Sequence, residues 1–281
     1  MAGEELVRRE DDGGVATLWL SRGPRNALDA ELLAALVEAM AGADADPDIG
    51  ALVLTGNGRT FSVGADLSTG PTAVRDLMAG LGGYGGKEFR EPAGRTTLRM
   101  AALSVPVIAA VNGDAIGGGA TVLLAADVRF AADSARFGFP FTRLGLCPEG
   151  ASTFFLPRLV GASRASDWLL SGRLIDAAEA LSAGLVSRVL PAGEVLAEAQ
   201  TYAREMVAHT SPSAVAATKA LLAAGPADPR TASDAESRTI AELAAAPDGL
   251  EGVAAFLDRR PPRFRKRNVA RPSNGVPATP A

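Results

Sequence analysis

Three consecutive glycines, Gly117–Gly119, are the residues whose type and position most directly suggest chemistry in this chain. The short apolar run Pro106–Val111 precedes them, and the apolar run Ala120–Ala126 follows them at once. The first run predicts a strand buried on both faces, and the second a buried helix. Glycines at a helix start allow close approach to the backbone, and first-turn N–H groups have no partner within the helix. This pattern predicts a place where backbone N–H groups hold an oxyanion.

A second glycine-containing segment, Phe61–Leu67 (FSVGADL), follows the predicted strand Ile49–Thr55. Gly64 lies there among small residues, which again indicates a backbone that another molecule approaches. The next segment, Ser68–Arg95, is rich in glycine and has no clean period, and we interpret it as a mobile lid.

The composition limits which side chains can do the chemistry. The chain has 281 residues, a formal net charge of −4, one cysteine and one histidine. The lone Cys147 excludes internal disulfides and cysteine-cluster metal sites. The lone His209 disfavours a Ser-His-Asp triad, and its place after a helical pattern predicts a helix-end residue. The negative net charge does not favour nucleic-acid binding. With one cysteine and one histidine, we expect carboxylates, hydroxyls and backbone groups to carry the function.

Neither a membrane span nor a secretory signal is expected from this sequence. No uninterrupted apolar run reaches membrane-spanning length, and the charged start MAGEELVRREDDGG differs from a secretory signal. We therefore expect a cytoplasmic protein with no membrane partner and no nucleic-acid partner.

The elements that must position these residues alternate between strand and helix over the first two-thirds of the chain, and the last third is helical. This order predicts an α/β fold with a helical C-terminal part. The expected elements include a hairpin of Glu5–Arg9 and Val15–Leu20 and a helix over Ala30–Ala43 with Asp29 as its cap. We divide the chain into a core at 1–195, a helical region at 196–262 and a disordered tail at 263–281.

A basic run, Arg259–Arg267, precedes that tail and carries six basic residues. It can be read as a solvated chain end or as a segment that helps to hold a phosphorylated ligand.

Several motifs in the same order resemble the crotonase superfamily, also called the enoyl-CoA hydratase/isomerase family. The resemblance covers roughly Glu5–Phe264. It rests on Asn26-Ala27-Leu28-Asp29, Leu52–Gly56 running to Phe61–Leu67, Val111-Asn112-Gly113 running to Gly117–Gly119, Asp127, Ala177–Ala180 with Gly184-Leu185-Val186, and Glu251-Gly252 running to Arg260.

The resemblance implies a spiral of repeated ββα units with a helical C-terminal oligomerisation region that forms homotrimers, often paired into hexamers. It implies an acyl-CoA thioester as substrate, with coenzyme A entering only as part of that substrate and no metal or redox cofactor. By position, the backbone N–H groups of Ala65 and Gly118 would hold the thioester oxygen. The residues that would contact coenzyme A are Arg25, Ala27, Ser62, Ala65, Asp66 and Leu67. Asp66 could equally cap the following turn.

The chain departs from the hydratases of that family at two positions. Where those enzymes have the glutamates that activate water, this chain has Thr121 and Phe141. Neither side chain titrates near neutral pH, so neither can act as the general acid or base that adding water requires, and ordinary hydratase or lyase activity is disfavoured.

The run Phe139–Gly150 is similar instead to the peroxisomal-type Δ3,Δ2-enoyl-CoA isomerases, in which a single glutamate at the position of Glu149 moves a proton. The neighbours expected from the sequence, which would desolvate the carboxyl and raise its pKa, are Phe139, Phe141, Leu144, Leu146, Phe154 and Phe155. The alternative is that Glu149 only caps the helix beginning near Gly150. We expect Cys147 to be a buried, inert thiol.

Three functions remain open. The first is an enoyl-CoA isomerase that uses Glu149, Ala65 and Gly118. The second is a hydratase-like or side-pathway member of the family that acts on an unusual acyl group. The third is an acyl-CoA-binding protein without turnover. Acyl length, trimer versus hexamer and the pathway, in fatty acid metabolism or elsewhere, are not determined by the sequence.

Overall fold

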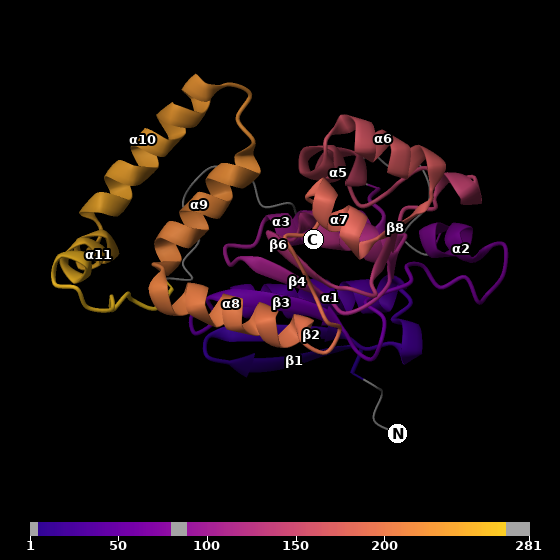
Figure 1. The fold of residues 1–281 in the computed structure, drawn as a ribbon, viewed down its shortest axis with the longest axis horizontal. Coiled ribbons are helices and arrows are strands. Elements are labelled where there is room, and N and C mark those ends of the chain that lie inside the picture. The colour runs from indigo at the N-terminus through magenta and orange to yellow at the C-terminus, as the bar shows by residue number, and fades with distance from the viewer. Residues whose placement is uncertain (1–4, 80–88, 268–281) are drawn as a thin grey trace.

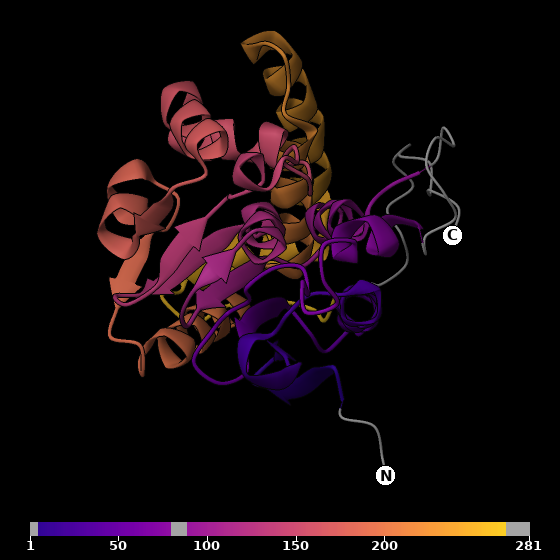
Figure 2. The ribbon, with the colours of Figure 1, turned by 90° about the vertical axis from the view of Figure 1, so that its right-hand side faces the viewer.

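The computed structural model describes residues 5–79 and 89–267 (Figures 1 and 2). The strands are β1 (Val7–Asp12), β2 (Val15–Leu20), β3 (Ala51–Gly56), β4 (Val107–Val111), β5 (Ala115–Ile116), β6 (Val128–Ala132), β7 (Arg136–Gly138), β8 (Leu174–Asp176) and β9 (Arg188–Leu190). The helices of the first part are α1 (Ala30–Asp44), α2 (Ala73–Ala79), α3 (Pro92–Ala101), α4 (Gly118–Val122), α5 (Ser152–Val160), α6 (Ala162–Ser171) and α7 (Ala177–Ala183). Those of the last part are α8 (Val195–His209), α9 (Pro212–Ala224), α10 (Pro229–Ala245) and α11 (Pro247–Leu257).

The larger sheet has the strand order β1-β2-β3-β4-β6-β9, and every pair except β1–β2 is parallel. Its central strands β3 and β4 are buried at every residue, which explains why they read as continuous apolar runs. Helix α8 packs across β2, β3, β4 and β6 (Figure 1). Helices α1 and α3 connect successive parallel strands and pack against each other. The sheet thus fixes where β3 and β4 end. The segment Phe61–Leu67 follows β3, and the segment that leads to Gly117–Gly119 follows β4.

A smaller sheet, β5-β7-β8, was not predicted as a sheet, and its strands β5 and β8 were missed. They span only two and three residues, too few to show a period. Strand β5 leads directly into the triple glycine, and the N–H of Gly117 donates to the carbonyl of Gly138 at 2.9 Å. The small sheet therefore holds the start of α4 in place.

The predicted α/β class with a helical C-terminal part is confirmed. The N-terminal hairpin is observed as β1 and β2, and the Asp29 side chain caps α1 by accepting from the Leu32 N–H at 2.9 Å. His209 is the last residue of α8, as expected. Among the helices of the described chain, none combines the length and apolar character that crossing a bilayer requires.

The last three helices extend away from the body that contains the sheets (Figure 1). No residue of α10 is buried. Helix α9 is attached to the core through Lys219, whose buried ammonium donates to Asp127 at 2.6 Å and to the Val105 carbonyl at 2.9 Å. A set of large apolar side chains on these helices is exposed: Leu222, Ile240, Leu250, Val253, Phe256 and Leu257.

The basic run is only partly a solvated chain end, because several of its side chains bind to the rest of the protein, and its predicted role in holding a phosphorylated ligand stays a prediction. Arg260 forms an ion pair with Glu251 at 2.7 Å, and Lys266 pairs with Asp48 at 2.5 Å. Arg267 is buried against the C-terminal end of α1, where it pairs with Asp44 at 3.0 Å. These bonds hold residues 263–267 against the protein, so the ordered chain continues past the boundary that we predicted. The remainder of the predicted tail, 268–281, lies outside the described residues.

Candidate active site

Two loops far apart in the sequence meet at the candidate site. The Leu28 N–H donates to the Gly64 carbonyl at 2.7 Å, and the Asp66 N–H donates to the Leu28 carbonyl at 3.1 Å. This isolated bridge pairs Leu28 with Ala65 and leaves the Ala65 N–H directed away from Leu28. A second bridge joins Ser62 to Ala115, at the start of β5. The loop after β3 is thereby attached to the segment that enters α4.

Gly64 allows this loop to approach α4. Its φ is +80°, a conformation that residues with a side chain rarely adopt. A methyl group added at Gly64 would lie 2.6 Å from the Ile116 carbonyl oxygen and 3.0 Å from the Gly118 nitrogen. Only glycine fits there, and it places the Gly64–Ala65 peptide beside the first N–H groups of α4.

The N–H groups of Ala65 and Gly118 have no hydrogen-bond acceptor among residues 5–79 and 89–267. Gly118 is the first residue of α4, where an N–H has no intrahelical partner. Two unpaired donors from neighbouring backbones are the arrangement that stabilises a developing oxyanion. The predicted pair of donors is therefore close together and free to bind.

Glu149 lies beside this pair of donors. Its Oε1 accepts a hydrogen bond of 2.6 Å from the hydroxyl of Thr121, a fully buried residue of α4. A methyl group added at Gly118 would lie 3.6 Å from the same oxygen. The carboxyl is thus held on the first turns of α4, next to the Gly118 N–H.

The surroundings of Glu149 change its acid–base properties. Burial raises the pKa of Glu149 to about 7. The Thr121 hydroxyl opposes this change by bonding to the carboxylate, and the negative charge of Glu91 adds to it. A carboxyl with a pKa near neutrality can both take up and return a proton at physiological pH.

The capping alternative for Glu149 is not supported. Helix α5 has no side-chain cap, and its N-cap position is occupied by Ala151. Only the backbone carbonyl of Glu149 serves that helix, by accepting from the Ser152 N–H at 3.1 Å. The carboxyl is directed to Thr121 instead.

Two expectations about the neighbourhood of Glu149 were wrong. Leu144, Leu146 and Phe154 are exposed, so only part of the predicted apolar surroundings exists. The contacts of the Glu149 carboxyl that the structure does show are with α4, through Thr121 and beside Gly118. Cys147, expected to be buried, is exposed.

The predicted coenzyme A contacts are distributed unevenly in the structure. Arg25 is exposed at the end of a short 3-10 helix (Gly23–Arg25), Ala27 is half-buried, and the side chain of Leu67 is half-exposed. Asp66 accepts from the Ser68 N–H at 2.9 Å, which is the turn-capping alternative. Ser62 is fully buried, and its hydroxyl donates to the Asn26 carbonyl at 2.7 Å. Ser62 therefore holds the loop, and its side chain is not available to a ligand.

The segment Ser68–Arg95, which we predicted to be a mobile lid, contains described residues on both sides of a gap. Helix α2 and the start of α3 lie within Ser68–Arg95, and residues 80–88 lie outside the described residues.

Sequence reasoning missed two polar groups of the site. Thr121 was noted only as a replacement for a glutamate, yet its hydroxyl binds the carboxyl of Glu149. Glu91 was not singled out at all, although its side chain accepts from the Gly150 N–H at 3.0 Å. The signal for Glu91 was an acidic residue directly before Pro92, which is typical of a helix start.

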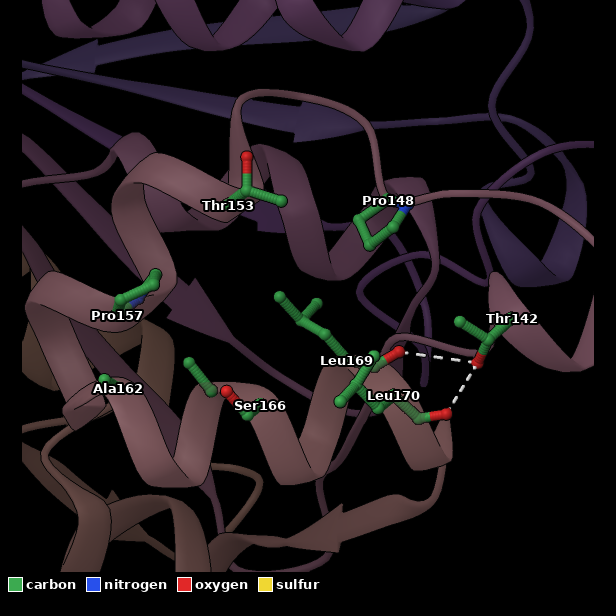
Figure 3. A pocket seen from close by; sticks show the side chains of 9 residues that line it. Thr142, Pro148, Thr153, Pro157, Ala162, Ser166, Leu169 and Leu170 are labelled. Carbon is green, nitrogen blue, oxygen red and sulfur yellow. Dashed lines mark hydrogen bonds between the residues drawn. The ribbon is translucent and has the colours of Figure 1, made fainter.

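An apolar cavity of about 300 Å³ lies between α5, α6 and the short 3-10 helix Thr142–Leu144 (Figure 3). The Thr142 hydroxyl at its rim donates to the Leu170 carbonyl at 3.0 Å. Pro148, the neighbour of Glu149, contributes to the lining, but neither Ala65 nor Gly118 does. The cavity is therefore separate from the polar centre, and we place the chemistry at the polar centre.

The fold and the site define an α/β protein with paired backbone donors beside the half-buried carboxyl of Glu149. Comparison with known sequences gives the family. The sequence model of the enoyl-CoA hydratase/isomerase family matches residues 10–267. The chain belongs to this family.

Individual relatives agree with that assignment. The 2,3-dehydroadipyl-CoA hydratase of Escherichia coli (strain K12) is 40% identical over 266 residues, which cover 94% of this chain and 99% of the relative. The enoyl-CoA hydratase ACTT3 of Alternaria alternata is 35% identical over 268 residues, covering 95% and 88%. The crystal structure of an enoyl-CoA hydratase from Polaromonas sp. JS666 matches with a TM-score of 0.84 and 31% identity, over 92% of this chain and 99% of that one. The fold is thus the crotonase fold with C-terminal helices.

These relatives carry hydratase names. The family resemblance is confirmed, whereas the narrower similarity to the Δ3,Δ2-isomerases is not shown by them.

Proposed function

We propose that this protein binds an unsaturated acyl-CoA thioester and moves its double bond by a 1,3-proton transfer. The observation that carries the proposal is the position of Glu149. It is the carboxyl held against α4 beside the two free N–H groups, while the hydratase positions hold Thr121 and Phe141. A single carboxyl suffices for such a transfer, because the group that takes the proton also returns it.

The proposed reaction begins with a 3-enoyl-CoA whose thioester oxygen accepts from the N–H groups of Ala65 and Gly118. The Glu149 carboxylate removes a proton from C2, the C2–H electron pair becomes the C1–C2 bond of a dienolate, and negative charge moves onto the thioester oxygen. Preorganised donors stabilise that charge. The dienolate then takes the proton from the Glu149 carboxylic acid at C4. The C1–C2 bond becomes single again, C2–C3 becomes double, and the carboxylate is regenerated.

Hydration of a 2-enoyl-CoA is the second candidate. The hydratase names of relatives up to 41% identical favour it. Glu149 would then be the group that activates water, and Glu91, whose charge acts on Glu149, would be a second carboxylate nearby. The absence of a titrating group at Thr121 and Phe141 argues against this reaction.

One experiment separates the candidates. Purified wild type, E149Q and F141E are given a 3-enoyl-CoA and, separately, a 2-enoyl-CoA, and the products are resolved by chromatography. We expect wild type to form the conjugated 2-enoyl product, and E149Q to lose on the order of a hundredfold or more of that rate. A 3-hydroxy product from the 2-enoyl substrate would establish hydration instead. Binding of both esters without any product would indicate a non-catalytic acyl-CoA-binding protein.

We also propose that the exposed apolar side chains of α9–α11 pack against further copies of this chain in a homotrimer or hexamer. Their number and exposure support this, because a chain of this kind seldom leaves six large apolar residues of neighbouring helices in water. Light scattering would test it, and a monomeric mass at micromolar concentration would contradict it.

A further inference from the structure

The turn that carries Glu149 is strained and needs support from elsewhere. Gly150 and Ala151 both have positive φ, +64° and +54°. The left-handed conformation is disfavoured for a residue with a side chain, here Ala151. Such strain persists only where surrounding contacts hold it. One contact is local, between the Ser152 N–H and the Glu149 carbonyl.

The other support comes from Glu91, 59 positions earlier in the chain. One oxygen of its carboxylate accepts from the Gly150 N–H at 3.0 Å, and the other accepts from the Gly94 N–H in the first turn of α3. A single carboxylate thus ties the turn of Glu149 to the start of α3. Glutamine cannot reproduce this, because its side chain offers only one acceptor oxygen.

The charge of Glu91 also acts on Glu149. Among the described residues, the polar side chains that act on the Glu149 carboxyl are Thr121, from α4, and Glu91, from the start of α3. The basic neighbours Arg90 and Arg95 are exposed, and the Arg95 guanidinium donates to the Arg90 carbonyl instead. A fixed negative charge close to a buried carboxyl favours the protonated form of that carboxyl.

We propose that Glu91 is a positioning residue for Glu149: it clamps the strained turn through Gly150 and keeps a negative charge beside the base. The inference deepens the proposed function, in which Glu149 transfers the proton. Glu91 itself touches no reacting atom in this proposal.

The test measures the titration of Glu149 in the free protein, so that it does not depend on a substrate. The infrared band of the protonated Glu149 carboxyl is isolated as the difference between each protein and its E149Q counterpart, and its midpoint is followed with pH. We expect E91Q to move the midpoint to lower pH, because a like charge is removed. E91D, which keeps the charge but withdraws it by one methylene, should move it in the same direction by less.

The matched control is D176N, which removes a carboxylate that caps another helix. Asp176 accepts from the Glu179 N–H at 2.7 Å at the start of α7. It should lose stability without moving the Glu149 midpoint. An unchanged or higher midpoint in folded E91Q, or in E91D should E91Q not fold, would overturn the proposal.

The second part of the experiment measures turnover, independently of the titration. With a 3-enoyl-CoA, E91Q should lower kcat and leave KM near the wild-type value, because the turn positions the base and not the thioester. An inactive wild type would refute the proposed function while the titration still decides the role of Glu91. Equal losses of kcat in E91Q and D176N would show that Glu91 acts only through stability.

Discussion

Replacing Thr121 by valine isolates the hydrogen bond that holds the Glu149 carboxylate. Valine has a similar shape, so T121V removes the donor 2.6 Å from Oε1 and leaves the buried position filled. A hydrogen bond to a charged group contributes about 1.5–3 kcal/mol. Because 1.36 kcal/mol corresponds to one pKa unit, the lost bond should move the Glu149 titration to higher pH by about 1–2 pH units.

The assay is the pH dependence of kcat/KM for the proposed isomerisation, with the infrared titration of Glu149 as a second readout. Wild type should lose activity as pH falls through about 7, where Glu149 takes up its proton. T121V should retain activity at high pH and lose on the order of tenfold at neutral pH, since less of the base is ionised.

The control for this prediction is T121S, which keeps the hydroxyl and should keep the acidic limb in place. An acidic limb of T121V that stays at the wild-type position, or moves to lower pH, would refute the role assigned to the bond.

Two further predictions concern stability. The carboxyl of Glu149 has an ordinary pKa of 4.5 and about 7 in the folded protein, so the folded state binds more protons between these values and stability falls as pH rises. E149Q should therefore be more stable than wild type at pH 8, by up to about 3 kcal/mol, and the gain should disappear in urea unfolding near pH 4; equal stability at pH 8 would contradict the buried charge. G119A would place a methyl group 2.5 Å from the Ser62 carbonyl oxygen and should lower the unfolding free energy by about 1–3 kcal/mol. G118A meets nothing closer than the end of the Leu28 side chain at 3.1 Å, so it should fold and lose more activity than stability; a G118A as unstable as G119A would contradict this.

The backbone part of the site could be predicted because glycines mark positions where another backbone or a ligand comes close to the chain. Gly64 and Gly118 are near one another in the structure, and a methyl group at Gly64 would lie 3.0 Å from the Gly118 nitrogen. The main helices and strands could be predicted as well, because α1 begins after a clear capping residue and β4 is a clear apolar run. Position in a recognised family then selected Glu149.

The side-chain partners of Glu149 could not be predicted in the same way. Glu91 reaches Gly150 across 59 positions, and no local pattern reports a contact of that range. Cys147 lies between apolar residues in the sequence, which led us to predict a buried thiol, but its side chain is exposed at the surface. Arg267 reads as part of a solvated basic run, yet tertiary contacts bury it against α1. For Glu91 and Arg267 the deciding interaction joins elements that the sequence keeps far apart.

The two groups that act on Glu149 have opposite effects, and this opposition matters for the reaction that we propose. Burial alone would favour a neutral acid that rarely ionises, whereas the Thr121 hydroxyl stabilises the carboxylate and Glu91 disfavours it. A group that removes a proton from one carbon and returns it to another needs comparable access to both forms. T121V and E91Q should therefore shift the Glu149 titration in opposite directions. The double variant T121V/E91Q should titrate between the two single variants, and it will do so only if both residues act on the same carboxyl.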